Sequence, residues 1–121
     1  MGPELSPEAR KLIPLTPAVF FVLLSLASEA KHGYAVMQEV EQLSDGEVRM
    51  GPATLYTTIQ RLGDLNLISE VTPPGDEEDS RRRYYEISLQ GRTLLDLELA
   101  RMKSLVRRAH AILAVRPEGE R

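Results

Sequence analysis

The residues best suited to chemistry in this chain lie on one arc of a helix that the sequence predicts from Pro52 onward. Proline favours the first turn of a helix, because its φ is already fixed and its missing N–H needs no partner there. Helical spacing then gathers small, hydroxyl, amide and guanidinium groups on that arc, namely Ala53, Thr54, Tyr56, Thr57, Gln60 and Arg61. A helix of this kind fits the major groove of B-DNA, where Gln and Arg read base edges and hydroxyls bind phosphates. The arc therefore predicts a helix that reads double-stranded DNA.

The opposite arc of this helix has the pattern of a buried stripe. Leu55, Ile59 and Leu62 follow one another at i, i+4 and i+7, which places them on one face. Downstream, residues 67–72 have strand character, and residues 82–87 alternate enough for a second strand after a Pro-Pro-Gly-Asp turn. A helix of this kind is common by itself, so the hairpin that follows it makes the prediction of DNA binding more specific.

An arginine run, Arg81, Arg82 and Arg83, opens the second predicted strand. These guanidinium groups are expected to bind DNA phosphates, and the alternative is a solvated strand edge. Adjacent strand residues point to opposite faces, so Arg81 and Arg83 need not act together with Arg82.

Two further helices are expected upstream. Thr16 and Pro17 form an N-cap and first-turn pair for a helix that is apolar on most sides. Residues 29–32 are a polar break, and Gly33 opens a second, amphipathic helix that ends in the Ser-Asp-Gly of residues 44–46. The order helix, helix, helix, hairpin, long helix predicts a mostly α chain with a small β-hairpin.

The last helix begins at Ser88, a good N-cap, and runs to about Val115. At a rise of 1.5 Å per residue it is about 40 Å long and overhangs a domain this small. Apolar residues follow one another along it at spacings of 4, 3, 4, 3 and 4, a heptad seam that consists of Leu95, Leu99, Met102, Val106, Ala109 and Leu113. The economical partner for the seam is a second copy of the chain, and the alternative is that the helix folds back over its own core.

These elements divide the chain into a DNA-binding domain, residues 1–88, and a C-terminal dimerisation helix with its tail, residues 89–121. Only residues 1–8 and 116–121 are expected to be disordered. The 121 residues suit one core, and the absence of cysteine excludes disulfide frameworks and thiolate metal sites. The densest apolar stretch, residues 18–24, is far shorter than the roughly 20 residues of a membrane span, so a soluble cytoplasmic protein is expected.

No motif indicates an enzyme or a cofactor. The chain lacks a Ser/His/Asp order, a phosphate-cradling glycine loop and a Cys–His pair. His32 and His110 are far apart and lack flanking ligands, so neither predicts a metal site. His32 is expected to terminate a helix and His110 to be solvated. The acidic run at residues 76–79 lacks the alternating ligands and central glycine of a calcium loop, which favours a solvated tip.

Tyr34 and Tyr56 admit two interpretations. Each could be a core aromatic, or each could present its hydroxyl to a phosphate while its ring packs. The phosphate interpretation is favoured, because Tyr34 lies at a helix start and Tyr56 at the edge of the exposed arc.

Five short segments, in order along the chain, carry a resemblance to a known family. They are Leu15-Thr16-Pro17, His32-Gly33-Tyr34, Thr54-Leu55-Tyr56 with Arg61-Leu62, Leu67-Ile68, and Arg83-Tyr84-Tyr85 running into Ser88-Leu89-Gln90-Gly91-Arg92. Together they resemble the PadR-like transcriptional regulators over roughly residues 15–113. The resemblance implies a winged helix-turn-helix domain, the single C-terminal dimerisation helix of the family's short form, and a homodimer that represses transcription from an operator. In this family a small molecule often releases the operator.

Two features depart from the family's pattern. The hairpin tip at residues 75–79 is unusually acidic for a segment near phosphates, and the chain has no tryptophan, on which some short members stack a flat aromatic ligand. A small aromatic or phenolic effector is still expected where the two last helices meet the first helices, in a cavity lined by Phe20, Phe21, Leu99, Met102 and Leu105. The alternative is that these residues fill the core.

The competing function is a winged helix used for protein–protein contact. A net charge of −3 and the acidic tip favour it, because nucleic acid usually selects a basic surface. The hydroxyl-rich helix and the symmetric seam argue against it, since the seam would present two reading heads to a palindromic operator.

Overall fold

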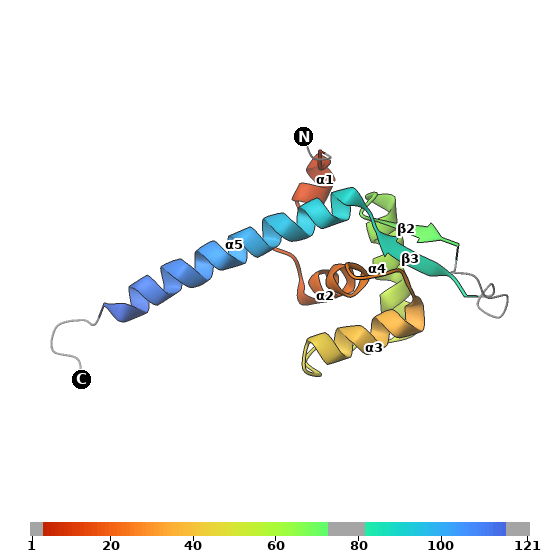
Figure 1. Cartoon of the computed structure of the whole chain (residues 1–121), viewed down its shortest axis with the longest axis horizontal. Helices are drawn as coiled ribbons and strands as arrows, with labels where there is room; N and C mark the ends of the chain where they lie inside the picture. Colours follow the sequence, from red (N-terminus) through yellow and green to blue (C-terminus); the bar gives the residue numbers. More distant parts are fainter. Residues whose placement is uncertain (1–3, 73–81, 116–121) are drawn as a thin grey trace.

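The computed structural model describes residues 4–72 and 82–115 of the chain. Within these residues the helices are α1 (Pro7–Arg10), α2 (Pro17–Leu26), α3 (Gly33–Leu43), α4 (Pro52–Asp64) and α5 (Leu89–Ala114). The strands are β1 (Lys31–His32), β2 (Ile68–Val71) and β3 (Tyr84–Ile87). Helix, helix, helix, hairpin and long helix therefore follow one another as predicted, with α1 and β1 as additions (Figure 1).

Residues at the helix starts explain where three of these helices begin. The Thr16 hydroxyl accepts a hydrogen bond from the Val19 N–H at the start of α2. The Ser88 hydroxyl accepts one from the Gly91 N–H at the start of α5. α4 has no side-chain cap and begins with Pro52, whose fixed φ already suits a helix. The predicted starts of these helices are thus confirmed.

The strands form one antiparallel sheet in the order β1–β3–β2. In the hairpin, Ile68 pairs with Ile87, and on the other edge of β3 Lys31 pairs with Tyr85. Residues 29–32 separate α2 from α3, as the polar break predicted, but Lys31 and His32 also form β1. The sequence did not indicate this strand, because two residues are too few to show alternation. Its pairing holds the start of α3 beside the hairpin.

The segment ahead of α2 packs on the domain. Leu5 and Ala9 are buried, and Ala9 belongs to α1. The disorder expected for residues 1–8 is therefore wrong from residue 4 onward, whereas residues 1–3 and 116–121 lie outside the described residues. Two isolated apolar residues in a polar segment give no periodic pattern, so the sequence did not indicate their burial.

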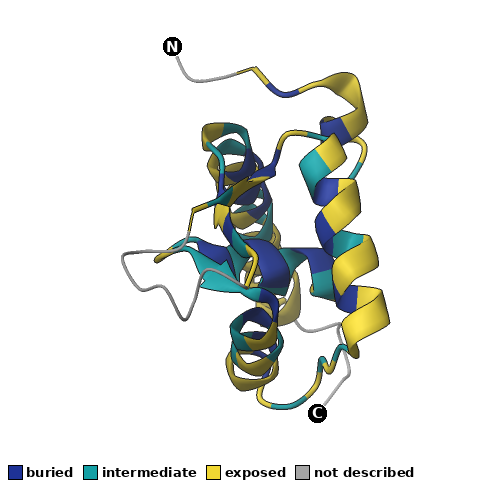
Figure 2. Cartoon of the chain, turned by 90° about the vertical axis from the view of Figure 1, so that its right-hand side faces the viewer, coloured by how far each residue is buried: buried dark blue, intermediate teal, exposed yellow. Residues whose placement is uncertain are grey.

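The core lies where α2, α3, α4 and the sheet meet the first part of α5. Its largest fully buried apolar side chains are Leu23, Leu26, Leu55, Leu62, Leu67 and Leu94. Gly91 packs directly on the Leu67 carbonyl, which leaves no room for a Cβ and brings α5 close to β2. Figure 2 shows the buried residues along the faces that the elements turn toward one another. None of the helices in the described part of the chain is long and apolar enough to cross a membrane.

A buried carboxylate joins α5 to the segment before α2. Glu98 is fully buried, and its Oε2 accepts a hydrogen bond of 2.7 Å from the Leu15 N–H. The Arg101 Nε lies 2.5 Å from the Glu98 Oε1 in an ion pair. The hydrogen bond from Arg101 lowers the pKa of Glu98 despite the opposing effect of burial, and the Leu15 N–H lowers it further. Glu98 is therefore ionised at neutral pH and satisfied on both oxygens.

Candidate nucleic-acid interface

α4 turns its polar arc toward solvent. Leu55, Ile59 and Leu62 are buried in the core, as their spacing predicted. The residues of the opposite arc are all exposed, and they are Ala53, Thr54, Tyr56, Thr57, Gln60 and Arg61. Small side chains near the start of α4 leave its backbone accessible, while Gln60 and Arg61 offer the groups that read base edges in a major groove.

Two threonine hydroxyls of α4 donate into their own helix. Thr57 Oγ1 donates to the Ala53 carbonyl and Thr58 Oγ1 to the Thr54 carbonyl, both at 2.9 Å. A hydroxyl has one hydrogen, so in this geometry Thr57 offers only acceptor lone pairs to solvent. A base amino group suits an acceptor better than a phosphate oxygen does. The exposed Thr57 Oγ1 can therefore accept a hydrogen bond from a ligand but has no hydrogen left to donate.

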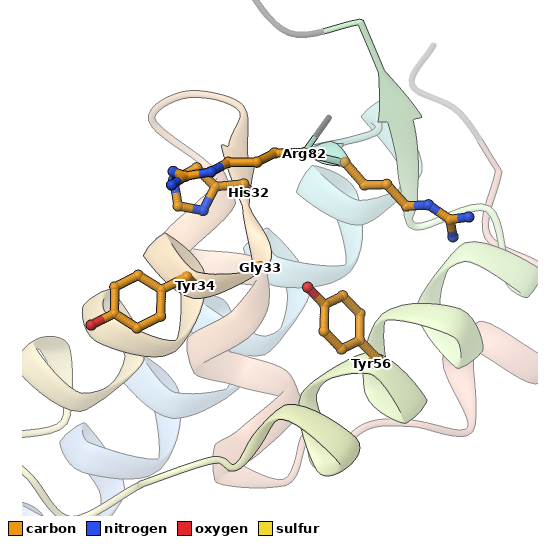
Figure 3. Close-up of a pocket in the computed structure, with 6 residues that line it drawn as sticks. His32, Gly33, Tyr34, Tyr56 and Arg82 are labelled. Carbon is orange, nitrogen blue, oxygen red and sulfur yellow. The ribbon is translucent and has the colours of Figure 1, made fainter. Parts of the chain in front are cut away.

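Two tyrosines lie at the junction of α3 and α4. Tyr34 is 61% exposed and Tyr56 is 46% exposed, so neither is a core aromatic. The Tyr56 ring lies against Gly33, the first residue of α3. Figure 3 shows Tyr34 and Tyr56 coming from two different helices, with His32 and Arg82 close to each other above them. The hydroxyls are therefore accessible to a ligand at this junction.

The described part of the arginine run places its side chains beside this junction. Arg82 Nη1 lies 3.0 Å from His32 Nε2. Arg82 and Arg83 both line a hollow that opens between α3, α4 and the approach to β3. The structure therefore gathers two of the three arginines at one place. Arg81 and the acidic residues 76–79 lie outside the described residues.

His32 is a residue of this junction that the sequence analysis did not assign to the interface. It was expected to terminate a helix, but its Nδ1 accepts a hydrogen bond of 3.3 Å from the Ala35 N–H and so caps the start of α3. Its ring also packs edge-on against Tyr84, with 5.5 Å between ring centroids. A histidine directly before a helix-opening glycine was the available signal, because an imidazole nitrogen can accept from a backbone N–H.

The neighbouring lysine serves the fold. Lys31 Nζ donates to the Ser25 carbonyl at 2.6 Å and lies 3.1 Å from Glu39 Oε2. Its side chain is only 11% exposed, so this ammonium group is engaged inside the protein. Among the residues that the structure describes, Arg82 and Arg83 carry the positive charge that the first hollow offers to a ligand.

A second hollow, of about 690 Å³, lies between α4 and the hairpin. Arg83 and Tyr85 line it, beside the carboxylates of Asp64 and Glu70. Burial raises the pKa of Tyr85, with smaller contributions from Tyr56 and Glu70. Its phenol is therefore protonated at neutral pH. The two carboxylates make this hollow a poorer place for a phosphate than the first.

The far half of α5 stands clear of the rest of the chain (Figure 1). Leu95, the first residue of the predicted seam, is buried in the protomer's own core. Of the later seam residues, Leu99 is 43%, Val106 53% and Leu113 77% exposed, whereas Met102 and Ala109 are partly buried. Leu105 and Ile112 beside the seam are exposed as well. A soluble protein rarely leaves so long an apolar stripe uncovered, so α5 has the surface of an interaction site.

The residues expected to bind an effector lie on two helices that contact each other, α2 and α5. Phe20 and Phe21 pack edge-to-face, with 5.3 Å between ring centroids, and are partly buried against the core. Met102 is partly buried, and Leu99 and Leu105 are exposed.

Comparisons of sequence place this chain among known proteins. A family model described as "Transcriptional regulator PadR-like family" matches residues 22–97. The chain is 35% identical over 88 residues to an "Uncharacterized 37.1 kDa protein in transposon TN4556" of Streptomyces fradiae, a match that covers 73% of this chain and 24% of that protein. The chain thus spans about a quarter of the length of this relative.

Solved structures share the fold. A PadR family transcription regulator from hypervirulent Clostridium difficile R20291 superposes with a TM-score of 0.67 at 17% identity, over 81% of this chain and 99% of that one. RosR of H. salinarum superposes with a TM-score of 0.58 at 25% identity, over 85% and 94% of the two chains. Both superpositions cover more than four fifths of this chain, so they include more than the helices and hairpin ahead of α5.

Proposed function

Because the chain belongs to the PadR-like family of transcriptional regulators, we propose that it is a homodimeric repressor that binds a palindromic operator through α4 and the wing, the hairpin of β2 and β3. The observation that carries the proposal is the exposed polar arc of α4, which lies beside the arginines that precede β3. α4 would enter the major groove, and the wing would lie along the backbone. The protein would act in the cytoplasm by binding alone, without catalysis or a cofactor.

The DNA contacts divide into two kinds. Gln60 and Arg61 would read base edges, with Thr54 and Thr57 beside them, because they lie on the arc that faces the groove. Tyr34, Tyr56 and the arginine run would bind phosphates, which fix register and orientation but carry no sequence information. The first kind sets which operator is bound, and the second sets how tightly any DNA is held.

A second copy of the chain is the proposed partner for α5. The exposed stripe from Leu99 to Leu113 supports this, because two such stripes can cover each other in a symmetric interface. Residues 1–88 would then form the reading domain and residues 89–121 the dimerisation unit. The two α4 helices must lie about 34 Å apart, or a multiple of this, to reach successive major grooves on one side of the duplex.

A small aromatic or phenolic effector is the finer part of the proposal. It would bind between α2 and α5, where the Phe20–Phe21 pair offers aromatic edges and Met102 can adapt its shape. A ligand that binds only the folded dimer raises its melting temperature, so a thermal-shift screen of planar aromatics and phenolic acids tests this. If no compound both stabilises the dimer and releases the operator, these residues only fill the core.

A protein–protein module is the second candidate, and the net charge of −3 favours it. An anisotropy titration with fragments from upstream of the chain's own gene, at two salt concentrations, separates the candidates. The repressor is expected to select one fragment and to lose affinity steeply with salt, because binding releases counterions from phosphates. A variant with Gln60, Arg61 and Arg82 all changed to Ala is the matched control. Absence of binding at low salt would decide for the protein–protein module.

A further inference from the structure

Two hollows adjoin at Tyr56 and Arg83, because these two residues line both of them. The first hollow has two guanidinium groups, those of Arg82 and Arg83, and no carboxylate among its lining residues. The second hollow, between α4 and the hairpin, has the guanidinium of Arg83 together with the carboxylates of Asp64 and Glu70. The net charge of the lining residues is therefore positive in the first hollow and negative in the second. A phosphate suits the first, and the second suits a cation.

The two carboxylates of the second hollow have no cation partner within the described residues. No ion pair among residues 4–72 and 82–115 includes Asp64 or Glu70, although Arg83 lines the same hollow. Both acidic side chains are exposed, so a ligand can reach them without breaking a contact inside the protein. A cationic ligand would therefore find two accessible negative groups in one hollow.

The floor of the second hollow is apolar and aromatic. It consists of Ile59, Ile68 and Tyr85, which are largely buried in the core. Glu70 lies opposite Tyr85 in the pairing of β2 with β3, and its charge contributes to the raised pKa of the Tyr85 phenol. Gly63 also lines the hollow, and a Cβ there would meet nothing within 4 Å, so α4 leaves open space at this point. The floor and the open space suit a flat ring.

We infer that the second hollow binds a small organic cation with a flat apolar body. Its cationic group donates charge-assisted hydrogen bonds to Asp64 and Glu70, and its ring rests on the apolar floor. The volume of about 690 Å³ lies within the usual range of small-molecule sites, about 300–1,000 Å³. A metal ion fits less well, because the described residues include no group of three or more His, Cys, Asp or Glu that could hold one. The site shares no residue with the effector cavity proposed between α2 and α5.

A cation bound in the second hollow is expected to compete with DNA. Tyr56, Gln60 and Arg83 line this hollow and also belong to the proposed DNA contacts. A ligand between α4 and the wing takes the space beside these side chains, so they serve one partner at a time. This consequence rests on the proposed DNA-binding function, whereas binding of the cation to the free protein does not.

Benzamidine is the probe, because it joins a flat ring to a cationic amidinium group. In ¹H–¹⁵N spectra of the whole chain it is expected to shift the amide resonances of Gly63, Asn66 and Ser69. A dissociation constant of about 1 mM is expected, because so small a ligand makes few contacts. Benzamide has nearly the same shape without the charge and is expected to bind about tenfold more weakly. Equal binding of the two compounds, or no shifts at about 10 mM benzamidine, would overturn the inference.

Variants of the hollow locate the site. Asp64→Asn combined with Glu70→Gln removes both charges at nearly constant shape and is expected to weaken benzamidine binding at least about tenfold. Gly63→Leu keeps the charges, fills the open space and is expected to prevent binding. Asp45→Asn combined with Glu47→Gln makes the same exchange outside the hollow and is expected to bind like the wild type. Wild-type affinity in Asp64→Asn/Glu70→Gln, or shifts confined to α2 and α5, would refute this site.

Competition is measured separately, by anisotropy titration of a mixed-sequence duplex of about 30 base pairs, enough for two half-sites. Benzamidine at ten times its dissociation constant is expected to weaken duplex binding by the wild type about tenfold, as for any simple competitor. Asp64→Asn/Glu70→Gln is expected to lose much less, which controls for an action of benzamidine on the DNA itself. A wild type that binds benzamidine but no duplex contradicts the DNA-binding proposal and not the cation site. A duplex affinity that bound benzamidine leaves unchanged contradicts the competition.

Discussion

The Tyr56 hydroxyl occupies the space that a side chain on Gly33 would need. A Cβ at residue 33 would lie 2.5 Å from Tyr56 Oη and 2.9 Å from its Cζ. The φ of Gly33 lies outside the left-handed region, so space and not backbone conformation requires glycine there. The contact sets how closely α4 approaches the start of α3.

We predict that Gly33→Ala lowers the free energy of unfolding by about 1–3 kcal/mol, the usual cost of overpacking. Urea denaturation followed by circular dichroism measures it. Gly63→Ala in α4 is the control, because a Cβ there meets nothing within 4 Å. That control is expected to be neutral or more stable by up to about 1 kcal/mol, since alanine favours a helix. If both variants unfold alike, Tyr56 yields to a methyl group and does not fix the junction.

We predict that Leu99→Asp combined with Val106→Asp abolishes the proposed dimer, because charge buried in an apolar seam costs several kcal/mol. Light scattering is expected to show monomer or aggregate. Ser104→Asp with Ala111→Asp adds the same charge at the same seven-residue spacing on the other side of α5, and this control is expected to keep the wild-type mass. An unchanged mass for Leu99→Asp/Val106→Asp removes the seam from the dimer interface.

Gln60→Ala is predicted to erode sequence preference by on the order of 1–3 kcal/mol against the best site, as expected when a base-edge contact is lost. Arg82→Ala should instead weaken all sequences about equally and lower the salt slope. Titrations of specific and scrambled duplexes at several salt concentrations separate the two outcomes. Equal losses on both duplexes for Gln60→Ala would show that this amide does not read a base.

The Glu98 carboxylate gives a prediction for acid stability. Folding lowers its pKa below the usual value of 4.5, so its stabilisation is complete above pH 4.5 and is lost as pH falls through the folded value. Glu98→Gln is expected to cost about 1–3 kcal/mol at pH 7, the worth of hydrogen bonds to a charged group, and less at lower pH. Denaturant titrations across this range test it, with exposed Glu86→Gln as the control. If the difference in unfolding free energy between the wild type and Glu98→Gln stays constant below pH 4.5, this would contradict an ionised Glu98–Arg101 pair.

Local pattern was enough to predict α4 and the hairpin. Pro52 set the helix start and the spacing of Leu55, Ile59 and Leu62 set its buried face, and both are short-range signals that the structure confirms. The hairpin likewise followed from two short runs around a turn. The exposed arc of α4 came from the same periodicity.

Long-range contacts were beyond the sequence pattern. His32 and Arg82 are 50 positions apart, and Leu15 and Glu98 are 83 apart. No spacing rule joins such pairs, since they meet only because the sheet and α5 return to the start of the chain. A lone glutamate on a helix also indicates solvent, because carboxylates are rarely buried without a partner. Only the fold shows that Arg101 and the Leu15 N–H supply one.

The hydrogen bond from the Leu15 N–H to Glu98 attaches α5 to the reading domain at one point, and this point can act as a pivot for α5. At 26 residues and 1.5 Å per residue the helix is about 39 Å long. The part of α5 beyond Glu98 is about 24 Å long. If two copies join along it, a change of about 10° at the pivot moves the far end of α5 by about 4 Å relative to the reading domain, roughly one step of 3.4 Å along DNA. Operators that differ by a few base pairs between their half-sites would thus select different angles. Changes near Leu15, remote from any base, would then alter which operator the protein prefers.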